Sequence, residues 1–256
     1  MEFIIYFLTA IGASLIGAIS GIGGGVIIKP VLDSMGKLPA GTVSFLSGCT
    51  VLTMAISSMI RNRSSHTHYN FRITVFLSLG AAVGGVLGRQ TASGMGKDLG
   101  LIQTAALLVI NGLVLIYVWN KSRITGLFVK NQWVSAGIGL ALGFVSSFLG
   151  IGGGPLNLAV LYFFFSMEAK EAAGNSLFII LVSQITSLVS VLVTHTIPDF
   201  PMEVLLLMCI GGVMGAIFGS AIGKRMDNKM TERFFFLLLW LLIGLNLFHL
   251  FQIFAH

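Results

Sequence analysis

The chain has 256 residues, of which 55% are hydrophobic and only 9% are charged. Soluble domains carry roughly a quarter of charged residues, and the uncharged runs of 16 to 21 residues in this chain are long enough to cross about 30 Å of hydrocarbon. The composition therefore excludes an ordinary soluble protein. The net charge of +6 does not indicate nucleic-acid binding, because the basic residues lie in short loops between apolar runs. We expect an all-α, polytopic helical membrane protein whose surroundings are a lipid bilayer.

The first apolar segment, residues 3–20, leads into the sequence GIGGG at residues 21–25. It lacks the basic start and the small-residue cleavage site of a removable signal peptide, so we expect it to be retained. Residues 3–32 would measure about 45 Å as helix, which is too long for one upright crossing and too short for two. We therefore expect a re-entrant hairpin, broken at the glycines, that dips to mid-membrane and returns.

Three further apolar spans complete the first half, at residues 44–60, 73–87 and 99–119. The loop before the second of these spans is basic and contains His66 and His68, but no further ligands accompany them, so no metal site is predicted. Arg89 and Lys97 are placed in the next loop.

The second half repeats this order, with GIGGG again at residues 150–154 and later spans at 177–194, 204–222 and 234–254. AGTVS at positions 40–44 is matched by AAGNS at positions 172–176, and three glycines spaced by four, starting at Gly80, recur starting at Gly211. All three features are displaced by nearly the same distance along the chain. Repeats of this kind are typical of transporters, so we predict two membrane repeats, residues 1–125 and 126–256, in one integral membrane domain.

Loop charges distinguish two arrangements of the halves. If each GIGGG segment crosses the membrane completely, the two sides hold 9 and 6 Lys or Arg residues; if each is a re-entrant hairpin, the split is 11 to 4. The positive-inside rule favours the second arrangement, with the richer side cytoplasmic. It predicts inverted repeats, a cell (cytoplasmic or inner) membrane location and both termini outside.

The glycine hairpins are the candidate binding elements. Short helices that start after such breaks would point free N–H groups and positive dipole ends into a central cavity, which suits an anion. The alternative is that GIGGG only makes a tight hairpin for close packing. The candidate glycines are Gly21, Gly23, Gly24, Gly25, Gly150, Gly152, Gly153 and Gly154.

Polar residues near the hairpins complete the predicted substrate-binding set. Lys29 follows the first motif and either supplies a cation, or carries a proton if neutral, or snorkels to headgroups. Five further polar residues either donate hydrogen bonds to substrate or cap helices. They are Asn157, Thr42, Ser44, Asn175 and Ser176. Gln184 either lines the path or bonds between helices.

Other chemistries find no support. GIGGG lacks the Lys and Ser/Thr of a P-loop, and no HExxH or GxSxG motif occurs, so no catalytic residue and no cofactor are predicted. Cys49 and Cys209 lie in apolar runs and are expected in the core. The glycine series at Gly80 and Gly211 are expected to pack helices closely. All nine carboxylates lie in loops or at segment ends, which disfavours cation transport.

The paired GIGGG motifs, Pro30 after the first, and the four-plus-four order of apolar segments resemble the TauE/SafE sulfite exporter family, also called TSUP. The resemblance implies a multi-pass carrier in a prokaryotic cytoplasmic membrane for sulfite, thiosulfate or organosulfonates. Two positions depart from the family pattern: Lys29 stands where an apolar residue is more usual, and Ala159 is equivalent to Pro30. We expect a secondary transporter of a small anionic substrate working by alternating access, with protons as a candidate coupling ion; a passive anion channel is the alternative. The sequence leaves the oligomeric state open.

Overall fold

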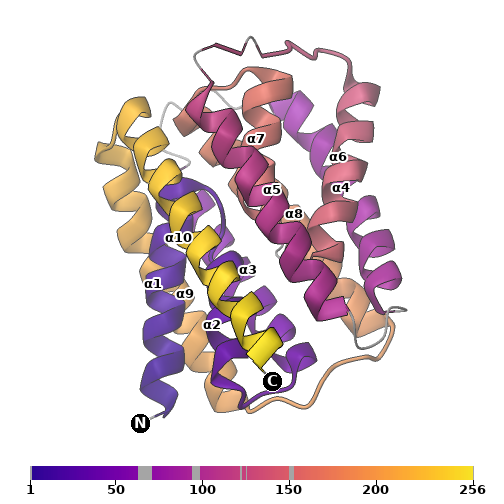
Figure 1. Ribbon diagram of the computed structural model, residues 1–256, viewed down its shortest axis with the longest axis vertical. Helices are drawn as coiled ribbons and strands as arrows, with labels where there is room; N and C mark the ends of the chain where they lie inside the picture. Colours follow the sequence, from indigo (N-terminus) through magenta and orange to yellow (C-terminus); the bar gives the residue numbers. More distant parts are fainter. Residues whose placement is uncertain are drawn as a thin grey trace.

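The protein is described by a computed structural model at residues 2–62, 71–93, 99–121, 123–124, 126–149 and 153–255. Over these residues the chain forms ten α-helices and no strand (Figure 1). The all-α class is therefore confirmed. The helices are α1 (Glu2–Ser20), α2 (Gly25–Met35), α3 (Ala40–Asn62), α4 (Phe71–Ser93), α5 (Leu99–Trp119), α6 (Gln132–Phe148), α7 (Gly154–Phe165), α8 (Ala169–Val193), α9 (Met202–Arg225) and α10 (Asn228–Ala255).

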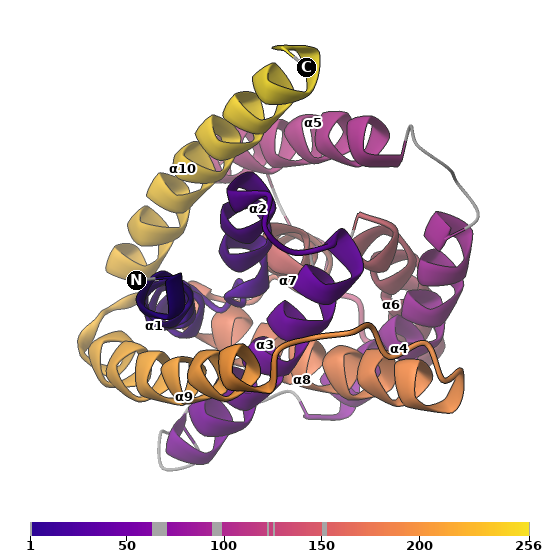
Figure 2. The same cartoon turned by 90° about the horizontal axis from the view of Figure 1, so that it is seen from below.

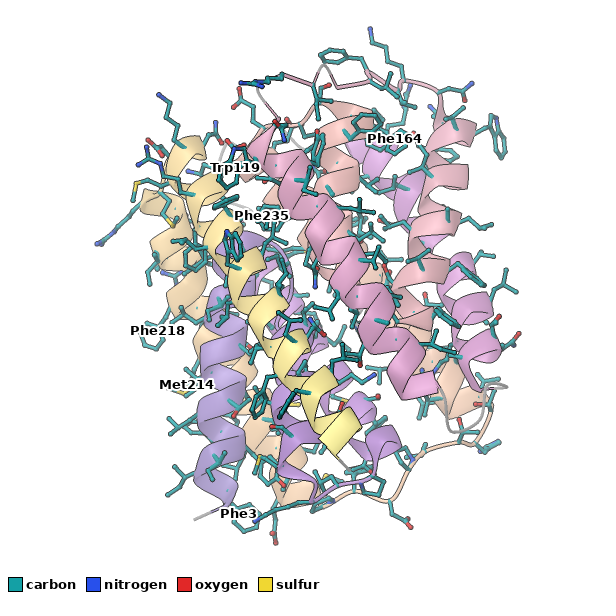
Figure 3. All side chains as sticks on the ribbon, in the orientation of Figure 1. Phe3, Trp119, Phe164, Met214, Phe218 and Phe235 are labelled. Atoms are coloured by element: carbon teal, nitrogen blue, oxygen red, sulfur yellow. The ribbon has the colours of Figure 1, made fainter. Side chains whose placement is uncertain are left out.

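Seven of these helices are long and apolar enough to cross a membrane, namely α1, α3, α4, α5, α8, α9 and α10. Large apolar side chains cover the outside of the bundle: Met214 and Phe218 of α9 lie at its outer edge in Figure 3, whereas Phe235 of α10 is fully buried. An apolar outer surface of this extent fits lipid rather than water. The prediction of a polytopic helical membrane protein is confirmed.

Glycine clusters separate α1 from α2 and α6 from α7. At the first break, Gly21 and Gly23 have φ angles of +77° and +85°, a backbone region in which a side chain would cause strain. At the second break Gly153 has a φ of +108°, while Gly150 and Gly152 lie outside the described residues. The helices end where the motif predicts. The re-entrant path of α1 with α2, and of α6 with α7, through a bilayer stays a prediction. Of these four helices, only α1 is long enough to cross the membrane by itself.

The two glycine series pack helices against each other, as predicted. A Cβ atom added at Gly84 of α4 would lie 2.0 Å from the backbone oxygen of Leu140 on α6. One added at Gly215 of α9 would lie 2.4 Å from the backbone oxygen of Ile11 on α1. Backbones approach this closely only where side chains are absent, so α4 with α6 and α1 with α9 form two tight pairs.

The helix contacts are matched between the two halves of the chain. Exchanging α1–α5 for α6–α10 in order turns the α1–α9 contact into α6–α4, α3–α9 into α8–α4, and α2–α3 into α7–α8. The contacts of α3 with α8 and of α5 with α10 map onto themselves. Seen from below in Figure 2, the short helices α2 and α7 lie inside a ring of longer helices. Both breaks are thereby brought to the interior of the bundle.

Two of the boundaries that differ from the sequence prediction bear on the candidate site. We predicted that the second long span of the first half ends at residue 87 and that Arg89 is in a loop, but α4 continues to Ser93 and includes Arg89. Likewise α8 begins at Ala169 rather than at residue 177, with Glu168 as its N-cap. Both predictions followed apolar runs only, whereas Ala, Lys, Glu and Arg extend helices readily without being apolar. Asn175 and Ser176 are therefore internal to α8 and do not cap it.

The segment between the halves is held against α7. The backbone N–H of Leu127 donates to the oxygen of Phe163 at 2.6 Å, and that of Val129 donates to the oxygen of Phe164 at 3.0 Å. These bonds satisfy carbonyls near the end of α7, which have no partner within the helix.

Candidate functional site

A cavity of about 320 Å³ lies between the two glycine breaks. Its lining residues come from both breaks and from every helix from α2 to α8. The lining consists of Ile22, Gly23, Gly25, Lys29, Gly41, Ser44, Ser47, Gly48, Val51, Arg89, Ala92, Gln103, Leu142, Gly143, Ser146, Ser147, Gly153, Asn157, Ile180, Ser183, Gln184 and Ser187. A volume of this size accommodates a small ligand.

The structure brings about half of the predicted binding set to this cavity. The members that line it are Gly23, Gly25, Lys29, Ser44, Gly153, Asn157 and Gln184. The described members outside its lining are Gly21, Gly24, Gly154, Thr42, Asn175 and Ser176. Gly150 and Gly152 lie outside the described residues, as do His66 and His68.

Three residues outside the lining have structural partners instead. Ser176 on α8 donates a hydrogen bond of 2.6 Å to the oxygen of Gly21, so it braces the first break. Thr42 donates to the oxygen of Asp199 at 2.9 Å, which ties α3 to the segment before α9. Asn175 accepts from Thr74 of α4 and donates to the oxygen of Glu171. These contacts position the helices around the cavity.

Lys29 is placed in the cavity by the way α2 is anchored. Its neighbours on the helix, Ile28 and Leu32, are 0% and 1% exposed and fix one face of α2 in the core. Lys29 lies on the face that lines the cavity. It lies within electrostatic range of Asp33, four residues along α2, and of Arg89 on α4.

Arg89 is a lining residue that the sequence reasoning missed. Its Nη1 donates to the hydroxyl oxygen of Ser187 at 2.7 Å and to the backbone oxygen of Ser187 at 3.2 Å, which fixes the guanidinium against α8. The sequence did contain an indication that the helix continues. Residues 89–93 include no proline or glycine, so no helix-breaking residue follows directly after Gly88. The prediction placed Arg89 in a loop because the apolar run ends at residue 87.

Asn157 of α7 has an unsatisfied side chain. The residue is 1% exposed, and neither its amide nitrogen nor its amide oxygen has a hydrogen-bond partner among the described residues. A Cβ at Gly153 would lie 2.5 Å from the Asn157 nitrogen, so glycine is required for this close approach. Buried polar groups without a partner are costly. A bound ligand in the cavity would supply the missing partner.

The starts of α2 and α7 add to the positive potential. Neither N-cap, Gly24 or Gly153, carries a side chain that could accept from the first N–H groups. Gly25 and Gly153 both line the cavity, so the two positive dipole ends face the same space.

The remaining polar lining is neutral. It includes Gln103, which donates to the backbone oxygen of Phe148, and serines of α3, α6 and α8. Within the described part of the chain no carboxylate lines the cavity, and no cluster of His, Cys, Asp or Glu there could hold a metal. Two basic side chains, uncapped helix starts and neutral donors together would suit a small anion.

Comparison with known proteins gives one family and one relative. Residues 6–247 match the family described as Sulfite exporter TauE/SafE. The chain is also similar to the probable membrane transporter protein YunE of Bacillus subtilis (strain 168). The two are 23% identical over 259 aligned positions, which cover 91% of each chain.

Proposed function

The chain belongs to the sulfite exporter TauE/SafE family, a family of membrane transporters rather than enzymes, and from this premise we propose that it is a secondary transporter of small sulfur-containing anions. Sulfite, thiosulfate and organosulfonates are the candidate substrates. The observation that carries the proposal is the pairing of Lys29 and Arg89 on one cavity whose described lining contains no carboxylate. Charged side chains within membrane segments are costly unless they serve a transported ion or a partner.

The anion is held between the two glycine breaks. Asn157 of α7 supplies an unpaired amide and Lys29 of α2 supplies a cation. The uncapped starts of α2 and α7 add backbone N–H donors. This is the arrangement in which broken helices hold an anionic substrate at the midplane of a transporter.

Alternating access by inverted repeats is the mechanism that we propose. Two observations support it. The helix contacts are matched between the halves, and in Figure 1 α1 begins at the lower end of the molecule whereas α6 begins at the upper end. The N and C marks both lie toward the lower end, so the two termini share one side, which we propose is the outside of a cytoplasmic membrane.

Uptake into proteoliposomes tests the proposal. Labelled sulfite, thiosulfate and a small sulfonate are offered with and without an imposed pH gradient, to the wild type, to Lys29→Ala and to Lys130→Ala, which changes an exposed lysine of the linker. We expect saturable uptake of at least one anion, driven uphill by the gradient, that Lys29→Ala loses and Lys130→Ala keeps.

Other outcomes are equally informative. Flux that never exceeds equilibrium would indicate a passive anion channel. Absence of uptake for all three anions, with the protein folded and inserted, would remove the support for sulfur-anion transport. Uphill uptake without a pH effect would exclude protons as the coupling ion.

A further inference from the structure

The two cations of the cavity are not repeated by the duplication. When the two GIGGG motifs are aligned, Lys29 corresponds to Leu158, which is fully buried and outside the lining. When the two glycine series are aligned, Arg89 corresponds to Ser220, which is also buried and outside the lining. Among the described residues, the cavity is therefore built by both halves but charged by the first half alone.

Neutral donors cannot select the charge of a ligand. Asn157 and the lining serines would hydrogen-bond any oxyanion, whether it carries one negative charge or two. The helix starts add partial positive charge, but within the described lining only Lys29 and Arg89 carry a formal charge, so selection by charge rests mainly on them. Asp33 lies near Lys29 and offsets part of its charge, but it does not line the cavity.

Resting on the proposed function, we infer that the cavity selects doubly charged inorganic oxyanions over singly charged sulfonates and, most strongly, over zwitterionic aminosulfonates. A dianion such as thiosulfate places negative charge opposite both Lys29 and Arg89. A simple sulfonate leaves one cation without a full countercharge. An aminosulfonate brings an ammonium group into a cavity whose described lining holds two cations and no carboxylate, and like charges in a confined site repel.

Arg89 is suited to this role by its present bonds. Both bonds to Ser187 come from Nη1, and a guanidinium carries more N–H donors than these two bonds use. The side chain can therefore remain anchored on α8 while it binds an oxyanion. Its planar donor arrangement suits two oxygens of one ligand better than a lysine ammonium does.

Competition for uptake tests the inference. Proteoliposomes take up labelled thiosulfate in the presence of unlabelled thiosulfate, sulfate, ethanesulfonate or taurine. We expect the dianions to compete at concentrations about tenfold or more below ethanesulfonate, and taurine to compete least. Equal competition by ethanesulfonate or taurine, with thiosulfate transported, would overturn the inference and leave the transport proposal standing. No uptake of any labelled anion would overturn both.

Charge-removing variants provide a readout that does not depend on expression. In Lys29→Met and Arg89→Gln we expect the preference for dianions over ethanesulfonate to shrink, because one cation of the pair is gone. The ratio is measured within each variant, so a partial loss of folded protein lowers both values and leaves the ratio unchanged. Lys29→Arg keeps the charge and should keep the preference. An unchanged ratio in both charge-removing variants would contradict the inference.

Sulfite offers an independent check, because it loses its second proton near neutral pH whereas thiosulfate is a dianion throughout. Sulfite should compete better as the solution is made mildly alkaline. Thiosulfate, measured in the same vesicles, reports any effect of pH on the transporter itself. Better competition by sulfite in mildly acidic solution would show that the singly charged form is preferred and would contradict the inference.

Discussion

The two glycine breaks are each followed by a short helix in the interior of the bundle, but they present different side chains. After the first break come Ile28 and Lys29; at the equivalent positions after the second come Asn157 and Leu158. Ile28 and Leu158 are both fully buried anchors, whereas Lys29 and Asn157 line the cavity. The cavity-lining residues of α2 and α7 therefore differ by one position when the two GIGGG motifs are aligned. The comparison teaches that a duplicated break can keep its place beside the cavity while one copy supplies a charge and the other supplies an amide.

The largest effect is expected when the second break is given a negative charge. Asn157→Asp places a carboxylate in a cavity suited to anions, so uptake of thiosulfate should fall on the order of a hundredfold in kcat/KM. Asn157→Leu removes only the amide and should cost about tenfold. The measurement is initial uptake rate against concentration in proteoliposomes. If the Asp variant transports as well as the Leu variant, the anion does not approach Asn157.

A second prediction compares the two tight helix pairs. Gly84→Ala would bring a Cβ to 2.0 Å from the Leu140 oxygen, whereas at Gly211 the nearest atoms are 3.0 Å away. We expect Gly84→Ala to destabilise the protein by about 2 kcal/mol and Gly211→Ala by less, because the backbones must move apart much further at Gly84 than at Gly211. Thermal unfolding in detergent measures both. Gly112→Ala, with nothing within 4 Å of its Cβ, is the control. Equal losses at Gly84 and Gly112 would contradict the close packing of α4 on α6.

The brace of the first break gives a smaller effect. Ser176→Ala removes the hydrogen bond to the oxygen of Gly21 and leaves a buried carbonyl without that partner, at a cost of about 1–2 kcal/mol. Thermal unfolding measures the loss, and Ser176→Thr, which keeps the hydroxyl, should retain part of the stability. A Ser176→Ala variant as stable as the wild type would show that the break needs no support from α8.

The smallest expected effect concerns the anchor of Arg89. Ser187→Ala removes the 2.7 Å bond to the hydroxyl but leaves the backbone oxygen that Arg89 also contacts. We expect KM for thiosulfate to rise about threefold with kcat nearly unchanged, because the guanidinium is less well positioned but still charged. Thr186→Ala, which changes a hydroxyl bonded within its own helix, is the matched control. A fall in kcat with KM unchanged would assign Ser187 a different role.

The sequence predicted the fold class, the helix breaks, the close packing at the glycine series and the family. These follow from apolar length, from backbone conformations that favour glycine and from the absence of side chains at helix contacts. The residue that the prediction missed, Arg89, lies beyond the end of an apolar run, and composition alone does not show that a helix continues past that point. Nor could spacing distinguish Thr42 and Ser176, which hold the framework, from Ser44, which lines the cavity. That distinction depends on partners from distant parts of the chain.

The close packing of α4 on α6 and of α1 on α9 has a consequence for how the protein is assembled. Each tight pair contains one helix from residues 1–125 and one from residues 126–256. Helices of the two halves are therefore packed between one another. We expect a rearrangement that opens the cavity to carry α4 together with α6 and α1 together with α9, so that each moving body combines helices from both halves. We therefore expect the two halves to stay associated when the chain is cut within the link between them.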